Sequence, residues 1–183
     1  MRICKLIAPL ACVVVLTACQ STTVISTENY NPQQHARIRL YGQNQKPSIM
    51  EYSIGNKKVE KNVGGSLGDA FSSLVGTAEN VSLGMPKTPM LNEMHNYDGI
   101  LSKVFYREFV IPAGVPVRVN NAFVGLGSSA PHYASYYYEA SCRSNTAVFT
   151  PQAGRDYEVV PLHNSRDCGV AVLDITSAKP PLQ

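Results

Sequence analysis

The chain has 183 residues, of which 44% are hydrophobic and 16% charged, a composition that suits a single domain with a real core. The normal apolar content, without a heptad or Gly-X-Y period, excludes collagen, coiled coil and extended disorder. A formal net charge of +3 without any run of Lys or Arg argues against nucleic-acid binding.

Residues 1–18 have the features of a removable targeting segment. Arg2 and Lys5 give a short cationic start, and an apolar stretch of about 11 residues then leads through small residues to Cys19. The stretch is too short for a transmembrane helix, which needs roughly 20 residues, and Pro9 weakens it further. A buried core helix is disfavoured because the stretch is apolar on both faces and a polar segment follows at once.

Leu16-Thr17-Ala18-Cys19 resembles the lipobox of bacterial lipoproteins, in which an aliphatic residue and two small residues precede a cysteine. The resemblance implies cleavage before Cys19, diacylglycerol on its sulfur and an acylated new N-terminus. Gln20 follows the cysteine, which is similar to the outer-membrane sorting pattern. We therefore expect a lipid anchor in the outer membrane and a protein that faces the periplasm, because two or three acyl chains anchor a protein far better than one.

Removal of Arg2 and Lys5 with the targeting segment lowers the number of basic residues from 16 to 14 against 13 acidic ones, so the net charge falls from +3 to +1. The mature chain would begin with residues 19–35, the lipidated N-terminus and a tether. From Gln20 to Gln34 the tether is rich in Ser, Thr, Asn and Gln and has no apolar period. About 15 such residues reach at most about 50 Å.

From residue 36 to residue 183 the dominant hydrophobic period is two. Ala36, Ile38 and Leu40 fall on one face, and both arginines between them fall on the other, as in a strand buried on one side. The further strand candidates are residues 48–54, 103–111, 115–123, 133–142, 147–150, 157–162 and 168–175. Short strands between turn signals predict an all-β fold, an antiparallel β-sandwich of about 7–8 strands. The one helical candidate is 67–75.

Residues 64–94 form a long glycine-rich segment with Pro86 and Pro89 and little hydrophobic period. A segment of about 30 residues without clear structure inside a compact domain is often functional. It can equally be a long, partly packed crossover between the two sheets, and both alternatives stay open.

Residues 111–119 and 151–159 are similar to each other. In each, Ala-Gly precedes apolar residues at the third and fifth positions after the glycine, Gly114 or Gly154. The pattern predicts a turn that needs glycine, followed by a strand with alternating faces. Such turns recur in small transthyretin-like and PEGA-like envelope sandwiches, which this half of the chain loosely resembles; the resemblance implies the fold and no function.

A tyrosine-rich stretch follows at residues 132–142. With a period of two, Tyr136, Tyr138 and Cys142 share a face that suits a core, while Tyr133 and Tyr137 share the other. Exposed tyrosines would offer a surface for a protein or a glycan. Ordinary cross-strand packing explains them as well and is the favoured interpretation.

Cysteine usage predicts one disulfide. Cys4 and Cys12 leave with the targeting segment and Cys19 is the predicted lipidation site, so Cys142 and Cys168 remain. An even pair in an oxidising compartment favours a disulfide, and its loop of about 26 residues would add roughly 3 kcal/mol. The rival interpretations are weaker: a zinc site would need two further ligands at short spacing, and a catalytic thiol would want a nearby histidine and a lowered thiol pKa.

Motifs of enzymes are missing from the sequence. There is no nucleophile elbow and no Ser-x-x-Lys. Residues 125–130 fit a loose G-x-G-x-x-A form, but Pro131 follows where a phosphate-facing helix should begin, which favours a glycine-rich hairpin loop. The histidines stand at no spacing typical of metal ligands: His35, His95, His132 and His163. We expect no enzyme, no metal, no cofactor and no nucleic-acid partner.

Together these features predict a membrane-anchored periplasmic lipoprotein that acts as a binding or assembly module of an envelope complex. Its partner surface would be the face with Tyr133 and Tyr137 or the segment 64–94. The alternative is a peptidoglycan- or glycan-directed binder or enzyme.

Overall fold

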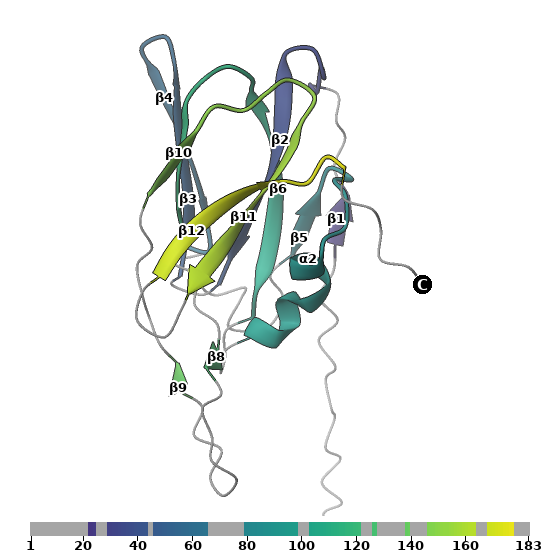
Figure 1. Ribbon diagram of the computed structural model, residues 1–183, viewed down its shortest axis with the longest axis vertical. Helices are drawn as coiled ribbons and strands as arrows, with labels where there is room; N and C mark the ends of the chain where they lie inside the picture. The colour runs from purple at the N-terminus through teal and green to yellow at the C-terminus, as the bar shows by residue number, and fades with distance from the viewer. Residues whose placement is uncertain are drawn as a thin grey trace, which may run out of the picture.

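Two β-sheets face each other in the computed structural model and form the layers of a sandwich (Figure 1). The structure describes residues 22–24, 29–43, 46–65, 79–98, 103–121, 126–127, 138–139, 146–163 and 168–177. For this part of the chain, the prediction of a mostly β fold with two sheets is confirmed.

The larger sheet has six strands in the order β1-β5-β6-β2-β11-β12. Their bounds are Thr22–Val24 (β1), Asn80–Ser82 (β5), Phe105–Pro112 (β6), His35–Gly42 (β2), Asp156–His163 (β11) and Cys168–Asp174 (β12). The pairs β1–β5, β5–β6 and β2–β11 are parallel, so the prediction of an antiparallel sandwich is wrong for this sheet. A period of two identifies a strand but carries no information about the direction of its neighbour.

The smaller sheet is antiparallel and has the order β10-β7-β3-β4. Its strands are Ala147–Phe149 (β10), Val117–Asn121 (β7), Ser48–Ile54 (β3) and Lys57–Val63 (β4). A separate antiparallel pair joins Leu126–Gly127 (β8) to Tyr138–Glu139 (β9). The sequence did not predict β4, because this exposed edge strand has mostly charged side chains, which suit an edge that must not pair with another chain.

The main core lies between the two sheets. Its fully or nearly fully buried members come from both layers: Ala36, Ile38, Leu40, Met50, Val63, Phe105, Ile111, Val117, Val119, Tyr157 and Val159. The predicted apolar face of β2 is therefore confirmed. The apolar positions predicted after the two Ala-Gly turns are confirmed as well, since all four belong to this cluster.

The two Ala-Gly turns lie at the same end of the sandwich. Gly114 and Gly154 both have φ 74°, a left-handed conformation that favours glycine, as the pattern predicted. The N–H of Gly114 donates to the carbonyl of Pro151 at 2.8 Å, and the N–H of Gly154 donates to the carbonyl of His35 at 2.8 Å. These hydrogen bonds connect the turn before β7 to the turn before β11 and to the start of β2.

A third layer covers the outer face of the larger sheet (Figure 1). It contains the short helix α2 (Pro89–Glu93) and the 3-10 helix η1 (Met94–Tyr97). Tyr41, Met94, Val104 and Tyr106 form a second buried cluster there, and Met90, Leu91 and Tyr97 pack against it. The expectation that β2 is buried on one side only is therefore wrong, because this layer buries Arg39 completely.

Residues 64–65 and 79–94 are the part of the glycine-rich segment 64–94 that the structure describes. It contains β5 and α2, and it leads from β4 in the smaller sheet to the larger sheet. The helical candidate 67–75 lies outside the described residues. Within the described ranges, no helix is long and apolar enough to cross a membrane.

The segment 19–35, expected as a tether, contacts the domain in two places. Its residues 22–24 form β1, which pairs with β5 from Thr22 opposite Asn80. Nearer to β2, the carbonyl of Asn31 accepts hydrogen bonds from the N–H groups of Gln34 and His35, and the carbonyl of Gln34 accepts one from Ala113.

Candidate functional site

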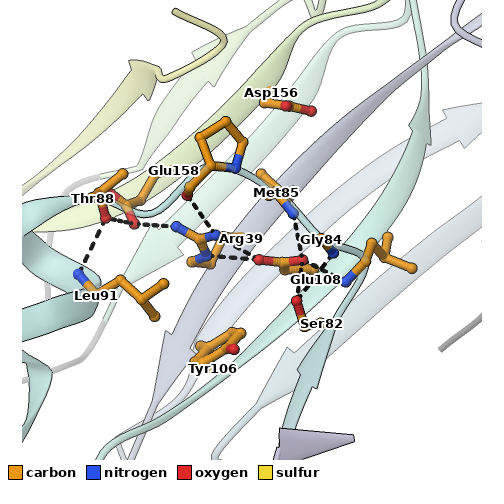
Figure 2. A network of polar contacts seen from close by, with 12 residues as sticks. Arg39, Ser82, Gly84, Met85, Thr88, Leu91, Tyr106, Glu108, Asp156 and Glu158 are labelled. Carbon is orange, nitrogen blue, oxygen red and sulfur yellow. Dashed lines mark hydrogen bonds and ion pairs between the residues drawn. The ribbon is translucent and has the colours of Figure 1, made fainter. Parts of the chain in front are cut away.

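A row of charged side chains crosses three adjacent strands on the outer face of the larger sheet. Arg39 in β2 lies opposite Glu108 in β6 on one side and opposite Glu158 in β11 on the other. Figure 2 shows the guanidinium between the two carboxylates. These three side chains are at most 1% exposed. We call them the buried triad.

The guanidinium of Arg39 donates hydrogen bonds through each of its nitrogens. Its Nε and Nη2 lie 2.9 Å and 2.6 Å from Oε1 of Glu108, and its Nη1 lies 3.0 Å from Oε1 of Glu158. Nη2 also donates to the carbonyl of Pro86 at 2.9 Å. Charge-assisted hydrogen bonds of this kind are about twice as strong as neutral ones, so they offset much of the cost of burying the ions.

Glu158 uses one carboxylate oxygen for all of its hydrogen bonds to the described residues. Oε1 accepts from Arg39, from the hydroxyl of Tyr41 at 2.7 Å and from the hydroxyl of Thr88 at 2.7 Å. No group in the described part of the chain donates to Oε2. Thr88 is also the N-cap of α2 and accepts a hydrogen bond from the N–H of Leu91 at 3.1 Å, so it joins the triad to the helix.

Glu108 holds the segment before α2 against the sheet. Its Oε2 accepts hydrogen bonds from the N–H groups of Leu83 and Met85 and, at 3.1 Å, from the hydroxyl of Ser82. The carbonyl of Pro86 accepts a hydrogen bond from Arg39 in the same way. Residues 82–86, which we call the crossing segment, therefore supply polar partners to both members of the Arg39–Glu108 ion pair (Figure 2). Buried ions need such partners, because a buried charge without them is strongly destabilising.

A second ion pair lies one row further along the sheet. Arg37 contacts Asp156 through two hydrogen bonds, from Nε to Oδ1 at 2.7 Å and from Nη2 to Oδ2 at 2.8 Å. Its Nη1 donates to the carbonyl of Leu83 at 3.1 Å, and its guanidinium lies 5.0 Å from the ring centroid of Tyr30. This pair balances its own charge.

The buried triad does not balance its charge, because one cation serves two carboxylates. Burial raises the pKa of Tyr41 well above its ordinary value, and the carboxylate of Glu158 raises it further, so Tyr41 is neutral and contributes only a hydrogen bond. Burial by itself lowers the pKa of Arg39, but its interactions with Glu108 and Glu158 raise it above its ordinary value. Arg39 is therefore charged, and its single guanidinium is shared by the carboxyl groups of Glu108 and Glu158.

An open hollow of about 530 Å³ lies beside the triad, between the start of α2 and the edge of the larger sheet. Its lining residues are Thr88, Pro89, Arg155, Glu158, Leu173, Asp174, Ile175 and Ser177. Leu173 lies opposite Glu158 in the β11–β12 register and is 44% exposed. The volume is in the usual range for small-molecule sites, which is roughly 300–1,000 Å³.

The rim of the hollow carries one weak ion pair. Nη1 of Arg155 lies 3.7 Å from Oδ2 of Asp174, and both side chains are 44% exposed. Hydrogen bonds from the side chain and backbone of Thr176 lower the pKa of Asp174, with a smaller contribution from Arg155. Among the charged residues of the lining, Arg155 and Asp174 offset each other, which leaves Glu158 as the remaining acidic residue.

Most of the residues that the sequence singled out lie outside the described residues: Cys19, Tyr133, Tyr137 and Cys142. Cys168 begins β12, but its side chain is outside the description, so the lipid anchor, the disulfide and the tyrosine surface stay predictions. Nδ1 of His35 accepts a hydrogen bond from the N–H of Asn31 at 3.1 Å, and His95 lies at the surface near Asp98.

Sequence reasoning missed the buried triad. In their strands, Arg39, Glu108 and Glu158 alternate with residues that face the core. Side chains at such positions normally point to solvent. Opposite charges at the centres of three strands were a usable signal, but the sequence does not reveal which strands are neighbours.

The described residues give no sign of a metal site, and the sequence has no recognised relatives. Among the described residues, no group of three or more His, Cys, Asp or Glu side chains could hold a metal ion. No protein-family model, curated protein or solved structure matches this chain.

Proposed function

We propose that this chain is a lipid-anchored module of the bacterial envelope that binds a ligand or partner through the hollow beside Glu158. The N-terminal lipobox pattern supports the anchor, and the hollow supports binding. The observation that carries the proposal is the open hollow of about 530 Å³ beside Glu158, and the position of β1 indicates where a lipid at Cys19 would lie relative to it.

The predicted anchor and the hollow belong to opposite ends of the larger sheet. β1 begins at Thr22, three residues after Cys19, and runs parallel to β5 and β6, so its first residue lies at the end where β6 begins. Arg155 and Asp174 lie at the end where β6 finishes, because β11 is parallel to β2 and β2 is antiparallel to β6. The rim of the hollow would therefore point away from the membrane.

The spacer between lipid and domain is short in this arrangement. Residues 20 and 21 lie between the predicted acylated cysteine and β1, and the three residue steps from Cys19 to Thr22 span at most about 10 Å. The domain would be held close to the bilayer, with the hollow available to the periplasm and its wall.

Binding is proposed in preference to catalysis because of how the charged groups are used. Arg39 and Glu108 are buried and hydrogen-bonded to the protein on all sides that the structure describes. Glu158 is the member of the triad that lines the hollow, and its Oε1 is held by three donors. The network supports a rigid wall for a ligand.

Two measurements test the proposal. Cys19→Ala should stop the incorporation of labelled fatty acid and leave unprocessed precursor, because the sulfur acceptor is gone. If that variant is still labelled and still fractionates with the outer membrane, the anchor is not at Cys19 and the proposal is wrong.

The second measurement is site-specific photo-crosslinking in intact cells. A crosslinker in place of Leu173 should capture an envelope component, whereas one in place of Ile54, an apolar residue on the smaller sheet that is even more exposed, should not. Capture of peptidoglycan from position 173 would favour the glycan-directed alternative. Equal patterns from both positions would contradict a binding role for the hollow.

A further inference from the structure

We propose that the hollow beside Glu158 binds a cation of a particular kind, an ammonium or guanidinium group carried on an aliphatic stem. This inference deepens the proposed function, since it names the chemical class that the same hollow would bind. Three independent features of the described residues support it.

The first feature is the charge of the wall. The buried triad has two carboxyl groups for one guanidinium, whereas Arg37 and Asp156 are paired one to one. On the rim, Arg155 and Asp174 also balance each other. Because an uncompensated buried charge is costly, a cation in the hollow would be stabilised by the protein, and an anion would be repelled.

The second feature is the carboxylate oxygen that has no donor. Oε1 of Glu158 accepts three hydrogen bonds, and no described group donates to Oε2. The side chain of Glu158 is 1% exposed, yet the residue lines the hollow. Glu158 therefore reaches the hollow with an oxygen that no described group donates to, and a donor group bound there could complete its hydrogen bonds. An ammonium or guanidinium supplies both the N–H donors and the charge.

The third feature is the apolar surface beside the carboxylate. Leu173 lies directly opposite Glu158 in the register, and Pro89 and Ile175 also line the hollow. Leu173 is 44% exposed, which leaves an aliphatic surface uncovered next to a buried negative charge. A side chain or small molecule with an aliphatic stem and a cationic tip matches both parts, since the stem can cover the leucine while the tip reaches Glu158.

Titration of the full chain with three probes of matched length tests the charge preference. The probes are n-pentylammonium, n-pentanol and n-pentanoate, and the readouts are calorimetry and the methyl NMR signals of Leu173 and Ile175. We expect pentylammonium to bind about tenfold or more tightly than either of the others and to shift both methyl signals. Equal binding of pentanoate, or signals that do not move, would overturn the proposal.

Two variants connect the binding to Glu158. Glu158→Gln keeps an oxygen acceptor for Arg39 and Tyr41 but removes the charge, and it should weaken pentylammonium binding by about tenfold or more. The matched control is Glu51→Gln on the smaller sheet, which should leave the affinity unchanged.

Leu173→Lys is a second variant that keeps the proposal testable if Glu158→Gln does not fold. The residue is exposed in β12, so the lysine should be tolerated, and its own ammonium should compete for Glu158 and abolish binding. Unchanged affinity in Leu173→Lys and in a folded Glu158→Gln would show that the cation binds elsewhere.

The outcomes separate this inference from the proposed function. If the crosslinker at position 173 captures an envelope component but pentylammonium is not preferred, the hollow binds a different ligand. The proposed function would then stand and the cation inference would be wrong. A cationic preference in vitro, together with a Cys19→Ala variant that is still labelled with fatty acid and still fractionates with the outer membrane, would support the site and contradict an anchor at Cys19.

Discussion

At the scale of the residue, the decisive feature is one arginine that serves two glutamates inside the protein. Arg39 contacts Glu108 at 2.6 Å and Glu158 at 3.0 Å, with at most 1% of any of these side chains exposed. Buried ion pairs are weak evidence for net stability, because desolvation offsets their attraction. They are, however, very sensitive to the loss of one partner, and this makes the triad testable.

Replacement of Arg39 should destabilise the protein strongly. Arg39→Met leaves two carboxylates buried without their cation, and we expect a loss of about 3–5 kcal/mol in the free energy of unfolding, measured by urea denaturation. The control is Lys58→Ala, which removes an exposed cation that contacts Glu51 at 3.0 Å and should have no measurable effect. A similar result for both variants would contradict the buried triad.

Tyr41 should make the stability depend on pH in the alkaline range. Its pKa is raised in the folded protein by burial and by Glu158, so its contribution is complete below the unfolded value of about 10 and is lost as the pH rises further. Tyr41→Phe should be less stable than the wild type at pH 7, and the difference should shrink above about pH 10. Urea denaturation from pH 7 to 11 measures it. A difference that stays constant up to pH 11 would show that Tyr41 ionises alike in both states.

At the scale of the element, the crossing segment before α2 is held by polar contacts more than by its own propensity. α2 has five residues, which is far too short to be stable alone. Thr88 caps it and also donates to Glu158, while Met90 and Leu91 pack on the second cluster. The helix exists because the sheet beneath it offers both an acceptor and an apolar surface.

Thr88 should therefore matter through its hydroxyl. Thr88→Val keeps the shape but removes the donor to Glu158 and the acceptor for Leu91, and we expect a loss of about 1–3 kcal/mol. Thr88→Ser keeps both hydrogen bonds and should stay close to the wild type. Thermal or urea unfolding of the three proteins distinguishes these outcomes, and a loss in Thr88→Ser without a loss in Thr88→Val would assign the effect to the methyl group instead of the hydroxyl.

Gly42, the last residue of β2, should tolerate no side chain. A β carbon there would lie 2.4 Å from the carbonyl oxygen of Val63, a backbone atom that can move only if β4 moves. We expect Gly42→Ala to cost roughly 2–4 kcal/mol in unfolding experiments. Gly55→Ala is the control, because a β carbon at Gly55 meets nothing within 4 Å and the cost is limited to its φ of 56°, about 1 kcal/mol. A larger loss at Gly55 would contradict the close approach at Gly42.

At the scale of the whole molecule, the described chain forms three layers, with the buried triad between the larger sheet and the crossing segment. Apolar packing is the main contact at the first interface, between the two sheets. The second interface combines a small apolar cluster with ion pairs and hydrogen bonds. A polar interface can be as rigid as an apolar one when its groups are satisfied, and it sets one arrangement of the covering segment.

The predicted disulfide is a property of the whole chain, since it would connect the start of β12 to the stretch before β10. Alkylation of the native mature protein without reductant should leave Cys142 and Cys168 unlabelled. Loss of either cysteine should cost about 2–5 kcal/mol and produce a thiol that forms intermolecular disulfides. Two freely alkylated thiols in the native protein would refute the bond.

The sequence by itself determined the local features of this protein. The period of two located β2, β3, β6, β7, β10, β11 and β12, because alternation follows directly from strand geometry. The two Ala-Gly motifs located turns at Gly114 and Gly154, because a left-handed turn favours glycine whatever surrounds it.

Only the tertiary structure decided what those strands lie next to. The direction of β11 beside β2, and the third layer over Arg39, depend on contacts between segments that are far apart in the sequence. Arg39 and Glu158 are 119 residues apart, and a charged residue on the outer face of a strand is exposed or buried according to which segment covers it. The candidate site could not be predicted for this reason, since its wall, its charge and its opening all arise from that covering segment.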